Sequence, residues 1–527
     1  MVNAVSDALQ RYRSLEPWAR NGLVGLAVLA SWPIAAATLD SGLPPGVVLL
    51  GAVMGSLSGM SAVGLVLIYR AARIVNFTQA TLGSAAGVVA IMLFSAWNWN
   101  YFLAFPVGIL VAVGAGAAID VLVIRRFFWA PRLILTLATI GLAQILGGME
   151  IGIPVLWGRP AIGSGFATPR SFTYEVGGQT FNGNHAMIMI VAPIAMGALA
   201  WFLKGTDAGT GIRAASENAE RAMLLGVPVR RLSTIVWMVA AAFSAMSFML
   251  GAPLLGYGTS VAGSSAAILP ALAAAVLARM ERLPKAFFAG VFLGIVTQAV
   301  KWNSDSLSFS DVILLGVVLV GLLLQRDKLS RADDAAASSW VGARETPPVP
   351  SELRHLPEVV WVRRGLLAAA AAFALALPSF LTVSQVNLLG TLTAMYAIVA
   401  ISLVVLTGWA GQISLGQFAF VGIGAVAAAN MLSNGWDLFL ALPFAAVCAG
   451  LAAVAVGLPA LRIRGLFLAV TSLALAVPAA SYFLNPAYFK SILPGTVDRV
   501  LLLERFPLIE EDNLYRFSLL VLVGVIV

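Results

Sequence analysis

The sequence predicts an all-α polytopic integral membrane protein whose two halves are related by a parallel repeat, and three observations support this prediction. The chain of 527 residues is 60% hydrophobic and only 11% charged, whereas soluble domains are about 25% charged. Apolar runs long enough to span a bilayer recur along the chain. A pattern of helices and polar residues in the first half also returns in the second half. This composition excludes a soluble enzyme, a disordered chain and a nucleic-acid-binding protein, although the net charge is +8.

The apolar runs fall into two groups that a hydrophilic segment separates. The first group predicts membrane helices near residues 23–39, 46–69, 76–95, 101–124, 133–153, 186–203, 233–253, 266–279, 286–301 and 309–325. The second group predicts them near residues 366–383, 388–407, 417–432, 438–461, 465–484 and 515–527. The run over 266–279 is short, which leaves both a spanning and a re-entrant helix open.

Composition divides the chain into four parts. Residues 1–45 form an N-terminal segment with one candidate membrane helix, and residues 46–325 form a first membrane domain. Residues 326–364 hold several prolines and charges of both signs, so we expect a cytoplasmic linker there. Residues 365–527 form a second membrane domain. This domain lacks a second copy of the Ala-rich loop described below, so we expect it to be incomplete.

Arginine and lysine residues orient the helices, because cytoplasmic loops are enriched in these cations. Arg11, Arg13 and Arg20 predict a cytoplasmic N-terminus. The number of apolar runs predicts a multi-pass protein of the inner or plasma membrane. The cation-rich loops near residues 70–73, 125–132, 204–231 and 279–285 then all fall on the cytoplasmic side. The N-terminal segment also resembles a signal peptide, but the acidic residues in its head favour a retained membrane helix.

Two segments share a local pattern: GLVLIYRAARIVNFTQATLGSAAG over residues 64–87 and SLVVLTGWAGQISLGQFAFVGIGA over residues 402–425. Each predicts an apolar helix, a short polar break and a Gly/Ala-rich helix, and Gln79 matches Gln417. Both copies enter from outside and turn inside, so the repeat is parallel, with an axis along the membrane normal. Convergence of low-complexity membrane sequence is the alternative explanation.

Polar residues beside these two breaks are the candidates for a solute pathway. Asn76, Thr78, Gln79, Ser414 and Gln417 supply hydroxyl and amide groups that suit the amine of a zwitterionic amino acid, and helix N-termini suit its carboxylate. The same groups would suit urea. The alternative is that these side chains only bridge neighbouring helices.

The loop over residues 204–231, KGTDAGTGIRAASENAERAMLLGVPVRR, predicts one short cytoplasmic helix over residues 214–225. Gly226 can end this helix in the left-handed conformation, and Pro228 prevents its continuation. Glu217 and Arg221 have the spacing of an ion pair on one face. A small apolar stripe on another face suits docking into a groove of a soluble partner, and consists of Ala215, Ala219, Ala222 and Met223. A solvated helix on the membrane surface is the alternative.

This loop also resembles a known family. ENAERAMLLGVPVRRL resembles the coupling segment of ABC-transporter permeases and is similar to the branched-chain amino acid permeases of the LivH and LivM type. YRAARIVNFTQATLGSAAG resembles LivH, whereas GWAGQISLGQFAFVGIGA and GLPALRIRGLFLAVTSLALA resemble LivM. The resemblance covers most of residues 46–325 and about residues 388–485. It implies a LivH-like half fused to a LivM-like half.

The resemblance implies the transmembrane subunit of an ABC importer for branched-chain amino acids or related small polar solutes. Cytoplasmic ATPase subunits would bind the coupling loop, and an extracytoplasmic solute-binding protein would deliver the solute. The chain has no G-x-x-x-x-G-K-[ST] loop, so ATP and Mg²⁺ would bind to the partner ATPase, and no enzyme activity or cofactor is expected in this chain. With one cysteine and two histidines, a metal centre is not expected either.

Two alternatives stay open: an ion-coupled secondary transporter, and an ABC permease for urea or amides. Acidic residues within membrane helices would favour the ion-coupled transporter, because such residues often serve transport. We expect Asp120 to form an ion pair near Arg125 and Glu150 to be solvated near the outer end of its helix. Few other acids lie in the apolar runs, which disfavours ion coupling.

Overall fold

The computed structural model describes residue 39, residues 41–324 and residues 356–526, apart from gaps at 128–129, 131, 159–165, 170–171, 256–260, 305, 411, 413, 462–465, 491–492, 494–500, 504–505 and 509. Within these residues, ten helices are long and apolar enough to cross a membrane, as the composition predicts. The helix expected over 23–39 lies outside the described residues except for its last residue, and most of the expected linker also lies outside them.

The first half consists of helices with one small hairpin. Its elements are α3 (Pro45–Ala72), α4 (Gln79–Trp97), α5 (Tyr101–Leu122), α6 (Arg132–Leu156), β1 (Thr173–Val176), β2 (Gln179–Asn182), α7 (Gly183–Gly205), α8 (Asp207–Glu217), α9 (Ala219–Leu224), α10 (Val229–Leu255), α11 (Val261–Leu277), α12 (Leu283–Asn303) and α13 (Phe309–Leu324). Strand β1 pairs antiparallel with β2, and Thr173 lies opposite Asn182. Residues 76–78 precede α4 instead of opening it, so this membrane helix starts at Gln79 and not at residue 76.

The second half repeats part of this order. Its elements are α15 (Pro357–Phe380), α16 (Val383–Gln385), a π-helical turn (Val386–Thr391), α17 (Leu392–Trp409), α18 (Gln417–Ser433), α19 (Leu438–Leu461), α20 (Leu466–Pro478), a second π-helical turn (Ala479–Phe483), β3 (Leu501–Leu502), β4 (Phe506–Pro507) and α21 (Glu511–Ile526). Four helices, a hairpin and a helix thus occur in both halves, as α3 to α7 and as α17 to α21. Helix α19 packs on α18 as α5 packs on α4.

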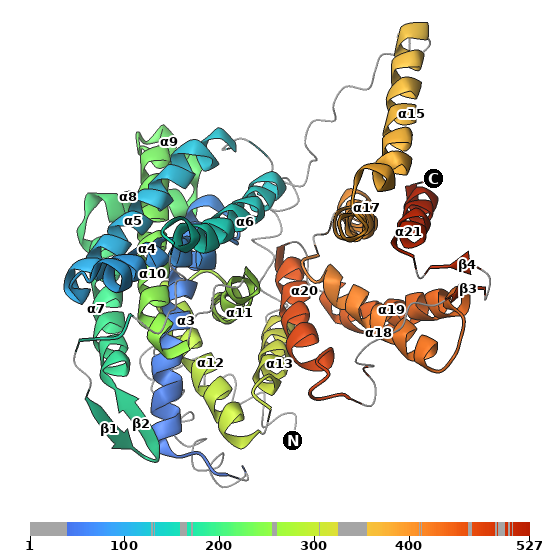
Figure 1. Cartoon of the computed structure of the whole chain (residues 1–527). Coiled ribbons are helices and arrows are strands. Elements are labelled where there is room, and N and C mark those ends of the chain that lie inside the picture. Colours follow the sequence, from blue (N-terminus) through green and yellow to red (C-terminus); the bar gives the residue numbers. More distant parts are fainter. Residues whose placement is uncertain are drawn as a thin grey trace, which may run out of the picture.

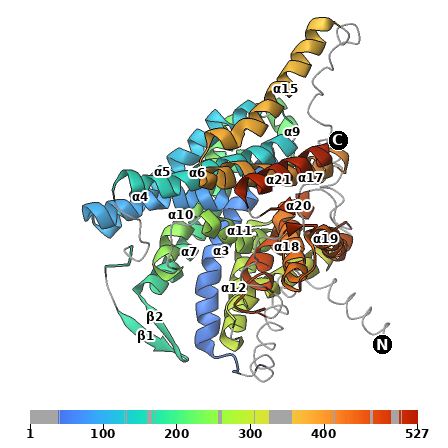
Figure 2. The same ribbon diagram turned by 45° about the vertical axis from the view of Figure 1, so that its right-hand side comes forward.

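Helix α15 begins at Pro357 and not near residue 366. Proline is favoured at the first helical position because its missing N–H has no helical partner there. None of the residues of α15 is buried, and the helix extends away from the others (Figure 1, Figure 2).

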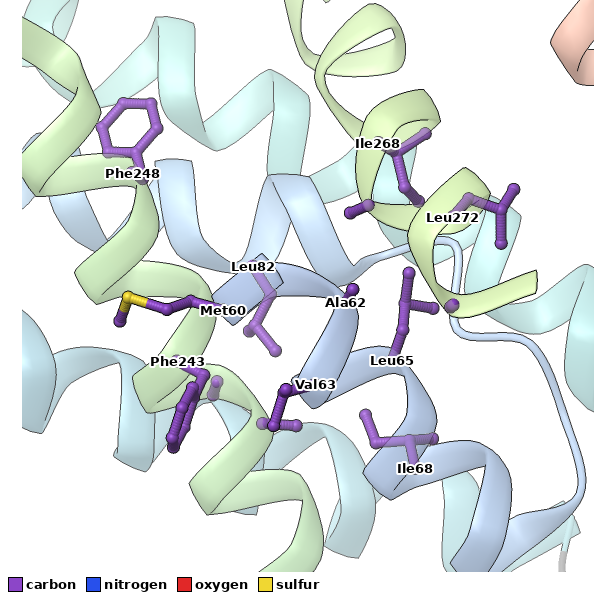
Figure 3. Packing of buried hydrophobic residues seen from close by; sticks show 14 of the residues in the cluster. Met60, Ala62, Val63, Leu65, Ile68, Leu82, Phe243, Phe248, Ile268 and Leu272 are labelled. Atoms are coloured by element: carbon purple, nitrogen blue, oxygen red, sulfur yellow. The ribbon is translucent and has the colours of Figure 1, made fainter. Parts of the chain in front are cut away.

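Helix α10 occupies the centre of the first half, against α3, α4 and α5. Figure 3 shows Phe243 and Phe248 of α10 around the same core as Met60 and Leu65 of α3 and Leu82 of α4. Glycines allow this close packing: a Cβ on Gly83 of α4 would lie 2.5 Å from the carbonyl carbon of Ser244. The Gly/Ala-rich helix predicted from sequence is thus the one on which α10 packs.

A second glycine contact joins α3 to α12. Gly51, Gly55 and Gly59 recur at every fourth position of α3, and Gly290 and Gly294 do the same on α12. A Cβ on Gly55 would lie 2.6 Å from the carbonyl oxygen of Gly290. Small residues at this spacing let the backbones of two membrane helices approach closely.

The two halves meet where α11 and α13 pack against α20 (Figure 1). Helix α11 is short, and its residues Ala271 to Val276 are fully buried, so its environment is protein and not lipid. The Ser481 hydroxyl donates to Asp311 Oδ2 at 2.7 Å, and the Phe309 and Tyr482 rings lie 5.5 Å apart. These polar and aromatic contacts fix the second half against the first.

Candidate functional site

The predicted coupling loop forms two helices rather than one. Asn218 lies between α8 and α9 in an extended conformation, with φ −154° and ψ 106°. Its side-chain oxygen accepts from the N–H of Arg221 at 2.9 Å, so Asn218 caps the start of α9. The expected continuous helix over 214–225 is therefore wrong. Asparagine is among the strongest N-cap residues, and this signal was present in the sequence.

Two residues of the predicted apolar stripe are buried inside the loop. Ala215 is 8% exposed and Ala222 is 3% exposed, and both pack with Val229 at the start of α10. Ala219 and Met223 pack against the same cluster. The expected ion pair of Glu217 with Arg221 is not found among the described residues, and Glu217 instead interacts electrostatically with Arg70 of α3. Ala215 and Ala222 therefore hold the two helices together and are not available for docking in this conformation, whereas Ala219 and Met223 are half-buried.

The surface that the loop presents is a pair of leucines. Leu224 is 87% exposed and Leu225 is 84% exposed, at the end of α9. Glu220 and Arg221 beside them are exposed as well. This pair was not predicted from sequence, because the expected single helix assigned docking to the face of Ala215, Ala219, Ala222 and Met223.

Gly226 ends α9 as predicted. Its φ is +81°, and its N–H donates to the carbonyl of Met223 at 3.0 Å, while the N–H of Val227 donates to the carbonyl of Ala222 at 3.0 Å. These two bonds define a Schellman motif. A Cβ on Gly226 would meet nothing within 4 Å, so glycine is needed for its backbone conformation and not for space. Pro228 follows in an exposed position, before α10 begins.

Polar contacts anchor the loop to the membrane helices at both ends. Arg70 Nη2 donates to Ser216 Oγ at 3.0 Å, and Arg73 Nη2 donates to the Ser216 carbonyl at 2.9 Å. At the other end, fully buried Asp120 accepts from the hydroxyls of Ser233 and Thr234 of α10, at 2.7 and 2.6 Å.

The ion pair expected at Asp120 is present. Arg125 Nε lies 3.1 Å from Asp120 Oδ2, and the Arg125 guanidinium also donates to the Thr234 hydroxyl. The pair therefore joins the end of α5 to the start of α10, directly after the Gly226 turn.

The first polar break is buried and saturated with internal hydrogen bonds. Asn76, Thr78 and Gln79 are each 0% exposed. Asn76 Oδ1 accepts from the Thr78 N–H at 3.0 Å, and Asn76 Nδ2 donates to Gln79 Oε1 at 3.3 Å. Gln79 Nε2 donates to the carbonyl of Ala240 in α10 at 3.0 Å, and the hydroxyl of Ser244 donates to the Gln79 carbonyl. These groups face one another and α10.

The second polar break lines an open cavity. This cavity of about 710 Å³ lies between α17, α18 and α19, and its polar lining residues include Ser402, Gln412, Ser414, Gln417 and Ser472. Gln417 Nε2 donates to Ser402 Oγ at 2.9 Å. Ser414 and Gln417, both proposed from sequence, thus lie on one cavity, whereas Asn76, Thr78 and Gln79 lie in a separate interior cluster.

One backbone contact has the same place in both breaks. The N–H of Phe77 donates to Thr139 Oγ1 of α6 at 3.2 Å, and the N–H of Leu415 donates to Ser472 Oγ of α20 at 2.9 Å. Phe77 and Leu415 match when Gln79 is aligned with Gln417. Each hydroxyl also donates to the carbonyl three residues earlier, at 2.8 and 2.9 Å.

Glu150 is not solvated, contrary to the expectation from sequence. It is 7% exposed, and its Oε2 accepts from the Ser84 hydroxyl at 2.5 Å. Ser84 belongs to α4, so Glu150 lies on the face of α6 that packs against α4.

Comparisons with known proteins agree with the resemblance seen in the motifs. A family model described as the permease component of a branched-chain amino acid transport system matches residues 47–323 and 385–492. The high-affinity branched-chain amino acid permeases LivH of Salmonella typhimurium and of Escherichia coli K12 are each 26% identical over 291 residues, which cover 52% of this chain and 91% of each relative. The autoinducer 2 import permease LsrC of an Enterobacter species is 25% identical over 293 residues, 51% of this chain and 77% of that protein. No solved structure matches.

The family model matches more than half of the chain and includes both polar breaks and the whole α8–α9 loop. The protein is therefore a multi-pass membrane permease component of an ABC transporter and not an enzyme, which removes the ion-coupled alternative. The chain belongs to the family of permease components of branched-chain amino acid transport systems.

Proposed function

We propose that the chain is the transmembrane subunit of an importer for branched-chain amino acids or related small polar solutes in the inner or plasma membrane. Its N-terminus lies in the cytoplasm. Separate ATPase subunits bind ATP and Mg²⁺ and drive transport, and an extracytoplasmic solute-binding protein delivers the solute. Family membership and the names of the two LivH relatives support this proposal.

The Leu224–Leu225 pair supports the contact with the ATPase most strongly. Two adjacent leucines that are 87% and 84% exposed are unfavourable in water, and burying each would contribute about 1.5–3 kcal/mol. Charged residues surround them, and the loop behind them is packed and anchored. A rigid apolar projection of this kind suits a groove on a soluble protein. The loop residues Ala215, Glu217, Ala219, Ala222, Met223, Gly226 and Pro228 shape and support this projection.

Residues 46–325 constitute a LivH-like domain and residues 365–527 a LivM-like domain, joined by the linker over 326–364 and preceded by the segment 1–45. A match to one family model in both halves supports this division. The shared order of elements supports it too, as does the equivalent contact of Phe77 and Leu415. In this proposal the two halves form one translocation unit.

The solute pathway includes the two polar breaks. Ser414 and Gln417 border a cavity with room for a small amino acid. Asn76, Thr78 and Gln79 would contribute only after α10 moves, because their polar groups bond to one another and to α10 in this conformation. An amide or urea would suit the same groups, so an importer of urea or amides is the second candidate function.

Co-purification with the ATPase tests the docking surface. We expect Leu224→Asp with Leu225→Asp to abolish co-purification of the ATPase at normal membrane abundance. Leu156→Asp is the matched control, because Leu156 is 84% exposed but lies at the far end of α6, away from the loop. Retained association in the leucine double variant would refute the docking surface.

Uptake into proteoliposomes tests the solute. The chain, its ATPase and its solute-binding protein are reconstituted with labelled leucine, and unlabelled valine or urea is added as competitor. We expect valine to compete and urea not to compete. Competition by urea alone would replace the amino acid by the amide class.

A further inference from the structure

Two arginines join the α8–α9 loop to the first polar break. Arg70 lies in the last turn of α3, and Arg73 is the residue that ends this helix. Both guanidinium groups bind Ser216, the first through its hydroxyl at 3.0 Å and the second through its carbonyl at 2.9 Å. Ser216 is 6% exposed and lies one residue before the end of α8.

The C-terminus of α8 is a suitable acceptor for these cations. The last carbonyls of a helix have no helical partner and have a partial negative charge. Arg73 supplies a donor to one of them. Arg70 binds the Ser216 hydroxyl, which itself donates to the carbonyl of Arg213 at 2.7 Å. Loop and membrane helix are thus connected by charge-assisted hydrogen bonds that depend on the position of α8.

Electrostatic repulsion makes this connection sensitive to movement. Arg73 and Arg213 both repel Arg70, and Glu217 is the acidic group that attracts it. Three cations against one carboxylate favour separation unless the end of α8 stays in place. A shift of α8 that breaks the two bonds to Ser216 would therefore also release Arg70 from its position.

Arg73 directly precedes the break that positions Gln79. Its φ is +56°, a left-handed conformation that is uncommon for residues other than glycine. The six residues from Arg73 to Thr78 then lead to α4, where Gln79 binds α10 through the Ala240 carbonyl. The N–H of Arg73 still donates to the Tyr69 carbonyl at 2.8 Å, whereas residues 74–77 belong to neither α3 nor α4, so movement of the Arg73 side chain would act first on this linking segment.

The second half has no such side chains at the matched positions. Aligning Gln79 with Gln417 places Gly408 at the position of Arg70 and Gly411 at the position of Arg73. A glycine has no group that can bind a serine of a loop helix. The arginine pair is therefore a feature of the first half and not a general requirement of the helix–break–helix pattern.

We infer that Arg70 and Arg73 are positioning residues that transmit movement of the ATPase-bound loop to the polar break at residues 73–79. This inference rests on the proposed function and deepens it, because it names how the loop and the pathway are connected. Loss of the pair leaves ATPase docking at Leu224 and Leu225 in place but disconnects it from the break.

The test uses the full chain with its ATPase and its solute-binding protein in nanodiscs. We compare wild type, Arg70→Ala with Arg73→Ala, Arg70→Lys with Arg73→Lys, and Arg282→Ala as an exposed cation control on another loop. The readouts are co-purification of the ATPase, ATP hydrolysis stimulated by the loaded binding protein, and leucine uptake. Co-purification reports whether the ATPase still docks, and leucine uptake reports whether its movement still reaches the polar break.

We expect the double alanine variant to bind the ATPase normally and to lose stimulated hydrolysis and uptake by about tenfold, the size of a typical coupling between sites. The double lysine variant should recover part of the loss, because lysine keeps the charge but not the fork of donors. Arg282→Ala should match wild type. If the double alanine variant transports normally, or if it loses the ATPase altogether, the inference is wrong.

Ser216→Ala keeps the test decisive if the double alanine variant does not fold. This change removes the acceptor of Arg70 but retains the backbone carbonyl that binds Arg73, so we expect a loss of uptake by a factor of about five with normal ATPase binding. Unchanged uptake would contradict the inference. Failure of the proposed function differs from both results, because wild type itself would then neither bind the ATPase nor take up leucine.

Discussion

The two polar breaks of this protein have similar sequences but different surroundings. Gln79 is fully buried and donates to a carbonyl of α10, whereas Gln417 borders a cavity and donates to Ser402. The position that matches Ser402 is Gly64, and a Cβ there would collide with the amide of Gln79. A glycine thus lets the amide of Gln79 pass on to α10, whereas a serine hydroxyl satisfies the amide of Gln417 locally.

The difference shows that neighbouring helices decide what a polar break does. In the first half, α10 covers α3, α4 and α5. In the described part of the second half, the groove between α17, α18 and α19 stays open as the cavity at Gln417. The same local pattern is therefore a buried, hydrogen-bonded segment in one half and part of a cavity wall in the other.

The largest effect should come from exchanging two matched residues of the helices that follow the breaks, Gly83 of α4 and Val421 of α18. Val421 matches Gly83, and we expect Gly83→Val to destabilise the fold by about 3 kcal/mol, because an added side chain meets the rigid backbone of Ser244. The reverse change, Val421→Gly, should cost about 1 kcal/mol at most, since Val421 is half-exposed. Detergent-solubilised yield and apparent Tm measure both. Equal effects would mean that α10 does not pack against Gly83.

Removing the two glutamines should separate stability from transport. Gln79→Ala leaves buried polar groups without partners and should cost about 1–3 kcal/mol, whereas Gln417→Ala should leave the apparent Tm nearly unchanged because its surroundings are accessible. We expect both variants to lower leucine uptake while ATPase association persists. Normal uptake by the double variant, at normal membrane abundance, would remove both residues from the pathway.

Valine substitutions at two glycines with the same backbone geometry distinguish the cost of backbone strain from an effect on ATPase association. Gly226 ends α9 at φ +81°, and Gly435 ends α18 at φ +82°, and a Cβ on either would meet nothing within 4 Å. Valine at either position should cost about 1 kcal/mol or somewhat more, because positive φ is unfavourable for a branched side chain. Only Gly226→Val should reduce ATPase association, since it misdirects Leu224 and Leu225. Equal loss of association in both variants would show a general folding effect.

The smallest effect tests whether the matched backbone contacts of the two breaks are equivalent. Thr139→Val and Ser472→Ala each remove the hydroxyl that accepts from the break's backbone, so each should cost about 1 kcal/mol. We expect the two apparent Tm values to fall by similar amounts. A measurable fall in only one variant would mean that the two contacts are not equivalent.

Much of the fold follows from local sequence. Apolar length predicts where most of the apolar helices lie, although α15 begins at Pro357 and not near residue 366. Gly226 with Pro228 predicts the turn after α9, because a left-handed residue and a missing N–H act through the backbone alone. The spacing of Asp120 and Arg125 likewise predicts their ion pair. Asn218 contained a cap signal of the same local kind, and it explains why one expected helix is two.

The sequence by itself determined that this chain is a set of membrane helices with a cation-rich loop and two polar breaks of similar sequence. Only the tertiary structure decided which faces are covered: that Gln79 is interior, that Glu150 binds Ser84, that Ala215 and Ala222 are internal while Leu224 and Leu225 project, and that the glycines of α3 meet α12. The physical reason is that lipid and protein interior are both apolar, so a membrane helix has no polar face to mark its packing side. Long-range contacts, and not hydropathy, assign each side of such a helix.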